Sequence, residues 1–191
     1  MANVSEKFGL RPYRKLDGTP LAGAQNRYTV KANYGTAIFQ GDLVIPTSTG
    51  NIERFVYNTT YAVVGVFNGV FYTDPTTQKP TWRNYYPGSI NASDITAFVV
   101  DDPDAVFLVD SDETFARTGL FNNYSVTNTT GVTQTGISKV QLDTSTAGTA
   151  TTFVIQAIDI SQDPENSDVS AANGNVLVRI NNHFYRSGAG K

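Results

Sequence analysis

The chain has 191 residues and a formal net charge of −3, and charged residues make up only 16% of it. It contains no cysteine and one histidine, which excludes disulfides, thiolate metal sites and multi-histidine zinc sites. Its 11 Phe and 10 Tyr residues exclude a chain that is disordered throughout. No apolar run approaches the roughly 18 to 20 residues that span a bilayer, so we expect no membrane partner.

The charge is unevenly distributed along the chain. Residues 1–31 hold six basic and two acidic side chains, a balance of +4, whereas residues 92–170 hold twelve acidic and two basic ones, a balance of −10. A phosphate backbone would repel so acidic a half, so we expect no nucleic-acid partner.

Residues 1–24 show no strong hydrophobic period. The run Phe8–Arg14 mixes apolar anchors with cations, and Pro12 biases the chain around it toward extended geometry. A free tail would rarely carry so many large apolar residues. We therefore interpret residues 1–24 as an extended N-terminal arm that packs on a surface. The sequence leaves open whether that surface belongs to its own domain or to a neighbouring subunit.

Beyond this arm, short apolar runs alternate with turn residues. The expected strands are Tyr28–Lys31, Ala37–Phe39, Leu43–Ile45, Ile52–Tyr57, Ala62–Tyr72, Ser138–Leu142, Thr151–Ile160 and Val176–Ile180. Asp112–Thr118 is expected to form a helical turn. The pattern predicts an all-β fold, a single-domain antiparallel β-sandwich or β-barrel over residues 25–186, followed by a flexible tail at 187–191.

The strongest strand signals lie in the middle of the chain. The apolar runs Ile95–Val100 and Ala105–Val109 flank the turn sequence Asp101–Asp104. Pro103 presets the backbone angle of a tight turn, and Asp102 can bond the turn backbone. We predict a β-hairpin that is covered on both faces, because neither run alternates with polar residues.

A long polar loop over Asp74–Pro87 carries three aromatic side chains, Trp82, Tyr85 and Tyr86. Loops of this length often have a function. The three rings could form a contact surface or a lid on the core, and the second reading is favoured.

Few residues in this sequence are suited to catalysis. His183 stands at the end of the last expected strand, where a hydrogen-bonded structural role is expected. The acids between Asp101 and Glu113 are numerous, but turn acids are usually solvated, and the calcium-loop pattern is absent. No glycine-rich phosphate loop occurs. We therefore predict a non-enzymatic protein with no catalytic, cofactor-binding or metal-binding residues.

Several short strings occur in a characteristic order across nearly the whole chain. They are Phe8–Arg14, Gly41–Val44, Val64–Gly69, Asp101–Phe107 and Val178–Tyr185. In this order they resemble the capsid decoration, or cement, proteins of tailed bacteriophages. The resemblance implies an all-β protein, made in the host cytoplasm, that binds the outside of the phage head. Its partners would be the major capsid protein and further copies of itself, a trimer being favoured over a dimer.

From the residues, the candidates for contact with the capsid or with another subunit are in the basic arm. They are Phe8, Arg11, Tyr13, Arg14 and Lys15. Arginine suits carboxylate contacts, and Phe and Tyr suit pocket filling. Two other readings stay open: a tail or fibre module that binds carbohydrate through the three loop aromatics, and an enzyme with carboxylate chemistry.

Overall fold

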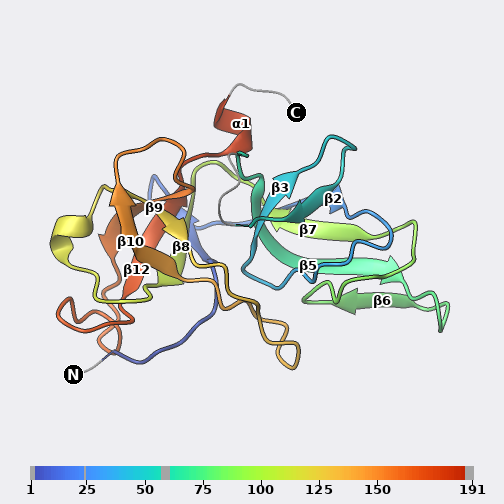
Figure 1. Cartoon of the computed structure of the whole chain (residues 1–191), viewed down its shortest axis with the longest axis horizontal. Helices are drawn as coiled ribbons and strands as arrows, with labels where there is room; N and C mark the ends of the chain where they lie inside the picture. Colours follow the sequence, from blue (N-terminus) through green and yellow to red (C-terminus); the bar gives the residue numbers. More distant parts are fainter. Residues whose placement is uncertain (1–2, 24, 57–60, 188–191) are drawn as a thin grey trace.

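Two antiparallel β-sheets form the fold in the computed structural model, which describes residues 3–23, 25–56 and 61–187 (Figure 1). Sheet A has the strand order β1 (Arg11–Lys15), β8 (Ala105–Asp110), β12 (Asn175–Ile180), β11 (Ile155–Ile160), β9 (Asn123–Val126) and β10 (Leu142–Gly148). The all-β prediction is confirmed, and of the two predicted architectures the sandwich is observed.

Sheet B holds the six consecutive strands β2 to β7. Its order is β2 (Gln25–Thr29), β7 (Thr96–Val100), β5 (Gly65–Thr73), β3 (Leu43–Pro46) and β4 (Ile52–Arg54), and β6 (Pro80–Arg83) also pairs with β5. The helical elements are a 3-10 turn at Arg117–Gly119 and the short helix α1 at Phe184–Ser187. Among the described residues, no helix has both the length and the apolar character needed to cross a membrane.

Element boundaries differ from the prediction at several points. Ala37–Phe39 contributes a single bridge, between Ile38 and Tyr86, in place of a strand. The strand expected at Ser138–Leu142 begins only at Leu142, and the helical turn lies later than expected. Ser187 ends α1, and the rest of the predicted flexible tail lies outside the described residues.

The predicted central hairpin is wrong. β7 pairs with β2 and β5 in sheet B, whereas β8 pairs with β1 and β12 in sheet A. The turn itself is present, because the Ala105 N–H donates to the Asp102 carbonyl (3.0 Å) and the Asp104 N–H donates to Asp102 Oδ1 (2.9 Å). Residues 101–104 therefore carry the chain from one sheet to the other. A turn between two apolar runs does not encode which strands each run will bond.

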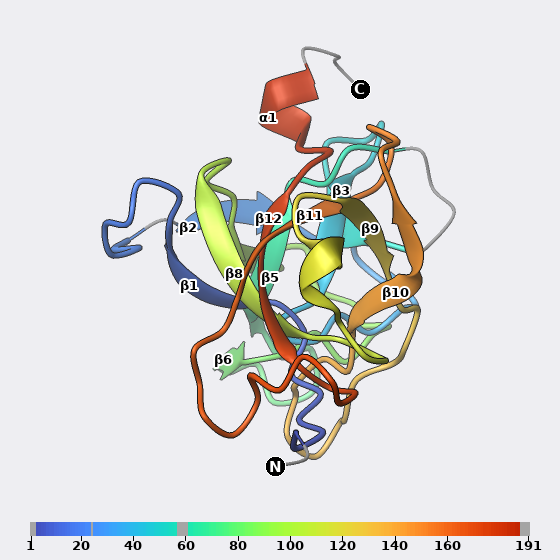
Figure 2. The same cartoon turned by 90° about the vertical axis from the view of Figure 1, so that its left-hand side faces the viewer.

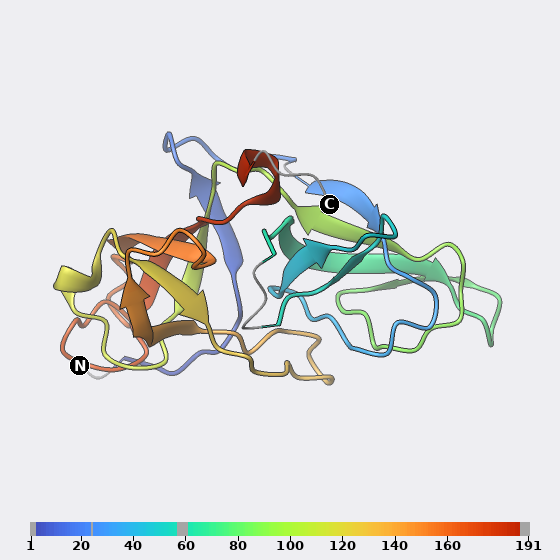
Figure 3. The same cartoon turned by 45° about the horizontal axis from the view of Figure 1, so that its top comes forward.

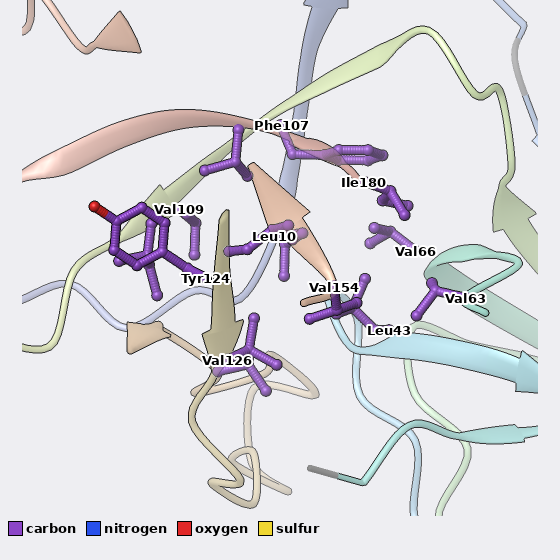
Figure 4. Packing of buried hydrophobic residues seen from close by; sticks show 14 of the residues in the cluster. Leu10, Leu43, Val63, Val66, Phe107, Val109, Tyr124, Val126, Val154 and Ile180 are labelled. Carbon is purple, nitrogen blue, oxygen red and sulfur yellow. The ribbon is translucent and has the colours of Figure 1, made fainter. Parts of the chain in front are cut away.

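The larger core lies between the two sheets. Phe107, Val109 and Ile180 of sheet A meet Leu43 and Val66 of sheet B in one buried cluster (Figure 4). Burial of these side chains supplies the main stabilisation, about 25 cal/mol per Å² of apolar surface removed from water.

A second core covers the opposite face of sheet B. Val44, Phe67, Val70 and Val99 point into it, and the fully buried Tyr86 closes it from a loop. Adjacent residues of β3 divide between the two cores, which explains why this strand is apolar without alternation.

The N-terminal segment belongs to this domain. β1 pairs with β8 and forms an edge of sheet A (Figure 2). Phe8 and Leu10 before it are only 7% and 1% exposed. An extended arm is therefore not confirmed, and of the two surfaces left open by the sequence, the segment packs on its own domain.

Candidate functional site

The edge strand β1 presents an interrupted, side-chain-rich surface. The pairing register shifts between Pro12 and Arg14, which leaves Tyr13 without a partner in a bulge and 57% exposed. Bulges re-aim side chains, and this one turns Tyr13 toward solvent. Pro12 has no N–H to offer an incoming strand, so the edge favours side-chain contacts over strand addition.

The other predicted contact residues have different surroundings. Phe8 is buried, and the Arg11 guanidinium lies 4.4 Å from the centre of its ring. Arg14 Nη1 donates to the Lys15 carbonyl (3.0 Å). Lys15 Nζ lies 2.8 Å from Asp102 Oδ2, and this hydrogen bond and charge raise the pKa of Lys15. Of the five candidates, Arg11 and Tyr13 are thus the exposed ones, and we call them the β1 surface.

An inter-sheet corner opens where β1 meets sheet B; β1 is the dark blue strand between the two sheets in Figure 3. It contains a cavity of about 120 Å³. The lining includes Phe8, Arg11, Gln40, Val66, Asn68 and Val100. Both sheets therefore contribute to this hollow.

A row of three hydrogen-bonded amide side chains begins in the lining of the corner, at Gln40 and Asn68, and continues to Gln25 of β2; we call it the amide ladder. Gln40 Nε2 donates to Asn68 Oδ1 (2.9 Å), and Asn68 Nδ2 donates to Gln25 Oε1 (3.0 Å). Each end of the ladder keeps bonding capacity, because neither the Gln25 NH₂ group nor the Gln40 side-chain oxygen bonds any other described residue. Nothing in the sequence marks these amides as neighbours.

Aromatic side chains continue the same face of sheet B. Trp82 and Phe71 are opposite each other on β6 and β5 and are 54% and 39% exposed. The Trp82 ring meets Phe98 of β7 edge-on, with 5.2 Å between centres. The Arg27 guanidinium of β2 lies 5.8 Å from the Phe98 ring. We call Phe71, Trp82, Phe98 and Arg27 the aromatic platform.

Gly69 allows Trp82 to lie against the sheet. A Cβ atom at this position would be only 2.4 Å from Trp82 Cη2. Gly69 of β5 pairs with Phe98 of β7, so the Trp82 ring lies over the β5 backbone at Gly69 and beside the Phe98 side chain. The other glycine of the predicted strand Ala62–Tyr72, Gly65, also makes a close approach, because a Cβ atom there would lie 2.3 Å from the Val100 carbonyl oxygen.

The three aromatics of the predicted loop have separate positions. Tyr86 is fully buried and covers the second core, which confirms the lid reading for this residue. Tyr85 stacks on Phe39, with ring centres 5.5 Å apart. Only Trp82 belongs to the platform, so a contact surface formed by all three rings is wrong.

Acidic side chains of the connection between the two sheets bond to neighbouring elements. Asp101 is 6% exposed and accepts hydrogen bonds from Tyr28 Oη (2.5 Å) and Asn26 Nδ2 (3.0 Å). Burial and this bond to a carboxylate raise the pKa of Tyr28. Arg186 of α1 pairs with Asp104. The expectation that the turn acids are solvated is therefore wrong for Asp101.

His183 has a structural environment. It is 1% exposed, and its Nδ1 accepts the Tyr185 N–H (3.2 Å). Burial lowers the pKa of the imidazole, which favours its neutral form. In the part of the chain that the structure describes, no three His, Asp or Glu side chains are arranged to hold a metal ion.

A buried ion pair, which the sequence did not reveal, joins sheet B to the loop before β10. Asp42 Oδ2 accepts the Phe39 N–H (2.9 Å) and lies 3.0 Å from Arg54 Nε, and Asp42 Oδ1 accepts the Ser138 hydroxyl (2.5 Å). Burial raises the pKa of Asp42, while Arg54 and Ser138 act to lower it. Arg54 Nη2 in turn donates to the Thr129 carbonyl (2.6 Å).

The fold and these surfaces define an all-β chain of two packed antiparallel sheets with exposed polar and aromatic side chains. No family model, curated protein or solved structure matches it. Its function has therefore to be argued from the β1 surface, the inter-sheet corner and the aromatic platform.

Proposed function

We propose that this protein is a structural virion component that binds the outer surface of a tailed-bacteriophage capsid and stabilises the head by bridging capsid subunits. The observation that carries the proposal is the β1 surface, where Tyr13 and Arg11 are exposed on a strand held by the domain. The ordered sequence strings that resemble decoration proteins support the same function. The protein acts by adhesion and not as an enzyme.

The chemistry of the β1 surface suits a protein interface. Tyr and Arg are enriched among the residues that dominate binding energy. Because β1 is already paired with β8, binding orders few additional groups, and the entropic cost of association is reduced. Arg11 provides a fork of donors for a carboxylate on the capsid.

A shell multiplies modest contacts. Each copy contributes a small interface, and many copies at symmetry-related positions act together on one particle. The partners are the major capsid protein and further copies of this chain, as a trimer or a dimer, on the capsid exterior.

Substitution tests this proposal better than truncation does. Deleting residues 1–16 would remove β1 and the buried Leu10, and would damage sheet A. The double variant Arg11→Glu/Tyr13→Ala changes exposed side chains only. The matched control is Arg117→Glu/Phe121→Ala, because Phe121 is 74% exposed and both residues lie away from β1.

The measurement is occupancy on heads that lack this protein, taken from the phage that encodes it. We expect the wild type and the control to decorate the heads fully by electron microscopy, and the β1 variant to lose most of its occupancy. Absence of wild-type binding would overturn the function, and full occupancy by the β1 variant would overturn the role of the β1 surface.

A further inference from the structure

We propose that the aromatic platform, together with the amide ladder beside it, is a binding site for an acidic oligosaccharide. This inference goes beyond capsid binding and does not depend on it. It rests on three features that meet on one face of sheet B: an exposed ring lying on the sheet, a neighbouring cation, and amide groups with remaining bonding capacity.

The platform matches the apolar face of a sugar ring. Trp82 is 54% exposed although it packs on Gly69 and against Phe98, so its outer face is preorganised and open to solvent. Trp supplies a large, rigid contact area with a small loss of conformational freedom on binding. A pyranose ring, which has C–H groups on its faces and hydroxyls around its rim, can stack there.

The amide ladder matches the hydroxyl rim. Its internal bonds fix the three side chains in a row, and the Gln25 NH₂ and Gln40 oxygen can donate to and accept from hydroxyls. Since Gln25 pairs with Val100, and Arg27 pairs with Phe98 two residues along the same strands, the ladder and the platform are adjacent. A chain of sugar units can contact both at once.

Arg27 sets the preference for an acidic sugar. It is exposed, it lies over the edge of the platform, and its guanidinium can bind a carboxylate with two parallel hydrogen bonds. Nucleic acid is disfavoured, because tracking a phosphate backbone requires a continuous basic groove and the chain carries a net charge of −3. An apolar protein surface is disfavoured, because it would desolvate the unsatisfied amides.

Trp82 is the single tryptophan, so its fluorescence reports on the site directly. The probe is a mixture of alginate oligosaccharides, which carry one carboxylate per sugar unit, and dextran is the neutral comparison. We expect a saturable change in Trp82 fluorescence with alginate that weakens with added salt. Dextran should bind at least about tenfold more weakly, the factor that corresponds to about 1.4 kcal/mol.

Variants identify the contacts by calorimetry. Trp82→Ala and Arg27→Gln should each weaken alginate binding about tenfold or more, the range expected for one stacked ring or one charge-assisted contact. Phe121→Ala and Arg117→Gln are the matched controls, and should bind like the wild type. Circular dichroism of Trp82→Ala establishes that the exposed substitution leaves the fold intact.

Three results would overturn the inference. They are no alginate binding at millimolar concentration, binding that Trp82→Ala leaves unchanged, and a Trp82 signal that follows protein concentration alone, which would assign the face to a second copy of the chain. Head decoration is measured separately, and Trp82→Ala should decorate heads normally. Failure of the sugar site and failure of the proposed function are therefore distinguishable.

Discussion

Asp42 and Asp110 are buried carboxyl groups in the two halves of the molecule, and they have opposite surroundings. Asp42, before β3 of sheet B, has Arg54, Ser138 and a backbone N–H as partners. Asp110, at the end of β8 in sheet A, has one amide donor, Gln141 Nε2 at 3.0 Å from Oδ2. Burial alone therefore does not decide the state of a carboxyl group; its partners do.

Asp110 lies across the sheet from another buried polar residue, Asn175. Asp110 pairs with Asn175 across β8 and β12, and the Ser111 N–H bonds the Gly174 carbonyl at the next position. By the alternation of antiparallel ladders, Asp110 and Asn175 form a non-hydrogen-bonded pair, whose side chains lie closest. Asp110 Oδ1 and Asn175 Oδ1 are both buried, and neither bonds any described residue.

This arrangement makes Asp110 easier to protonate than an exposed carboxyl group. A neutral carboxyl group can donate its O–H to the Asn175 amide oxygen, whereas an ionised one can only accept from the NH₂ group of that amide. Burial raises the pKa of Asp110 to about 6. Lys7 acts to lower that pKa, and Asp112 and Glu6 act to raise it. Sheet B thus pairs its buried carboxyl group with a cation, whereas the buried carboxyl group of sheet A has a single amide donor and a pKa raised by burial.

The largest expected effect is at the paired group. Asp42→Ala leaves the Arg54 cation buried and uncompensated, and should reduce the free energy of unfolding by about 3 to 5 kcal/mol in urea denaturation. The double variant Asp42→Leu/Arg54→Met replaces both charges and should recover more than half of that loss. A double variant that is no more stable than Asp42→Ala would contradict a role for the stranded charge.

At Asp110, which has no cation beside it, removing the charge should stabilise the protein at high pH, the opposite of the effect at Asp42. The folded-state pKa of about 6 lies above the ordinary value of 3.8, so the contribution of Asp110 is fully present below pH 3.8 and is lost as the pH rises through 6. Asp110→Asn mimics the protonated form. It should raise the free energy of unfolding at pH 8 by about 3 kcal/mol and have little effect near pH 4.

Urea denaturation at pH 4 to 8 measures this difference, and comparing the variant with the wild type cancels other titrations such as that of His183. Glu113→Gln, an exposed acid nearby, is the control and should show no such trend. Carboxyl NMR of the wild type gives the pKa of Asp110 directly. A value near 4 would contradict the raised pKa.

A smaller effect is expected where the Asp42 pair meets the N-terminal segment. Gly9 has a φ of 69°, and a Cβ atom there would lie 2.6 Å from Ser138 Cβ and 2.7 Å from the Gly41 carbonyl. Gly9→Ala should therefore cost about 2 kcal/mol more than Gly18→Ala. Gly18 has a similar φ of 87° and no atom within 4 Å of the added Cβ. Equal thermal shifts for the two variants would contradict this close packing.

The smallest effect is expected at the partly exposed ion pair of Lys15 with Asp102. Lys15→Met removes the contact with Asp102 (2.8 Å), and solvent screens that pair. The midpoint of urea denaturation should stay within measurement error, which sets a baseline for the buried pair. A loss comparable to that of Asp42→Ala would show that exposure does not separate the two pairs.

Local sequence signals predicted the strands better than their partners. The alternating run Val176–Ile180 becomes β12 almost unchanged, because one apolar face per strand is a local requirement. The hairpin prediction failed because the hydrogen-bond partners of β7 and β8 are distant in sequence. The bulge at Tyr13 has no local signature beyond the neighbouring proline.

For the candidate sites, too, single residues could be predicted from the sequence, but their neighbours in space could not. Trp82 was noticed as an aromatic residue in a polar loop, but Phe71, Phe98 and Arg27 reach it only through the order of four strands. Asp42 and Ser138 are 96 positions apart, so no motif could connect them. The basic character of residues 11–15 was visible, whereas the burial of Phe8 followed from the pairing of β1 with β8.

The passage of the chain from β7 to β8 has a mechanical consequence. Residues 96–110 run without a break through both sheets, so a pull applied to one half reaches the other along covalent bonds. Lys15 and Arg186 form ion pairs with Asp102 and Asp104 of this connection, between the end of β7 and the start of β8. Sliding one sheet past the other must therefore stretch this covalent connection as well as separate side chains, so the connection resists relative motion of the two sheets.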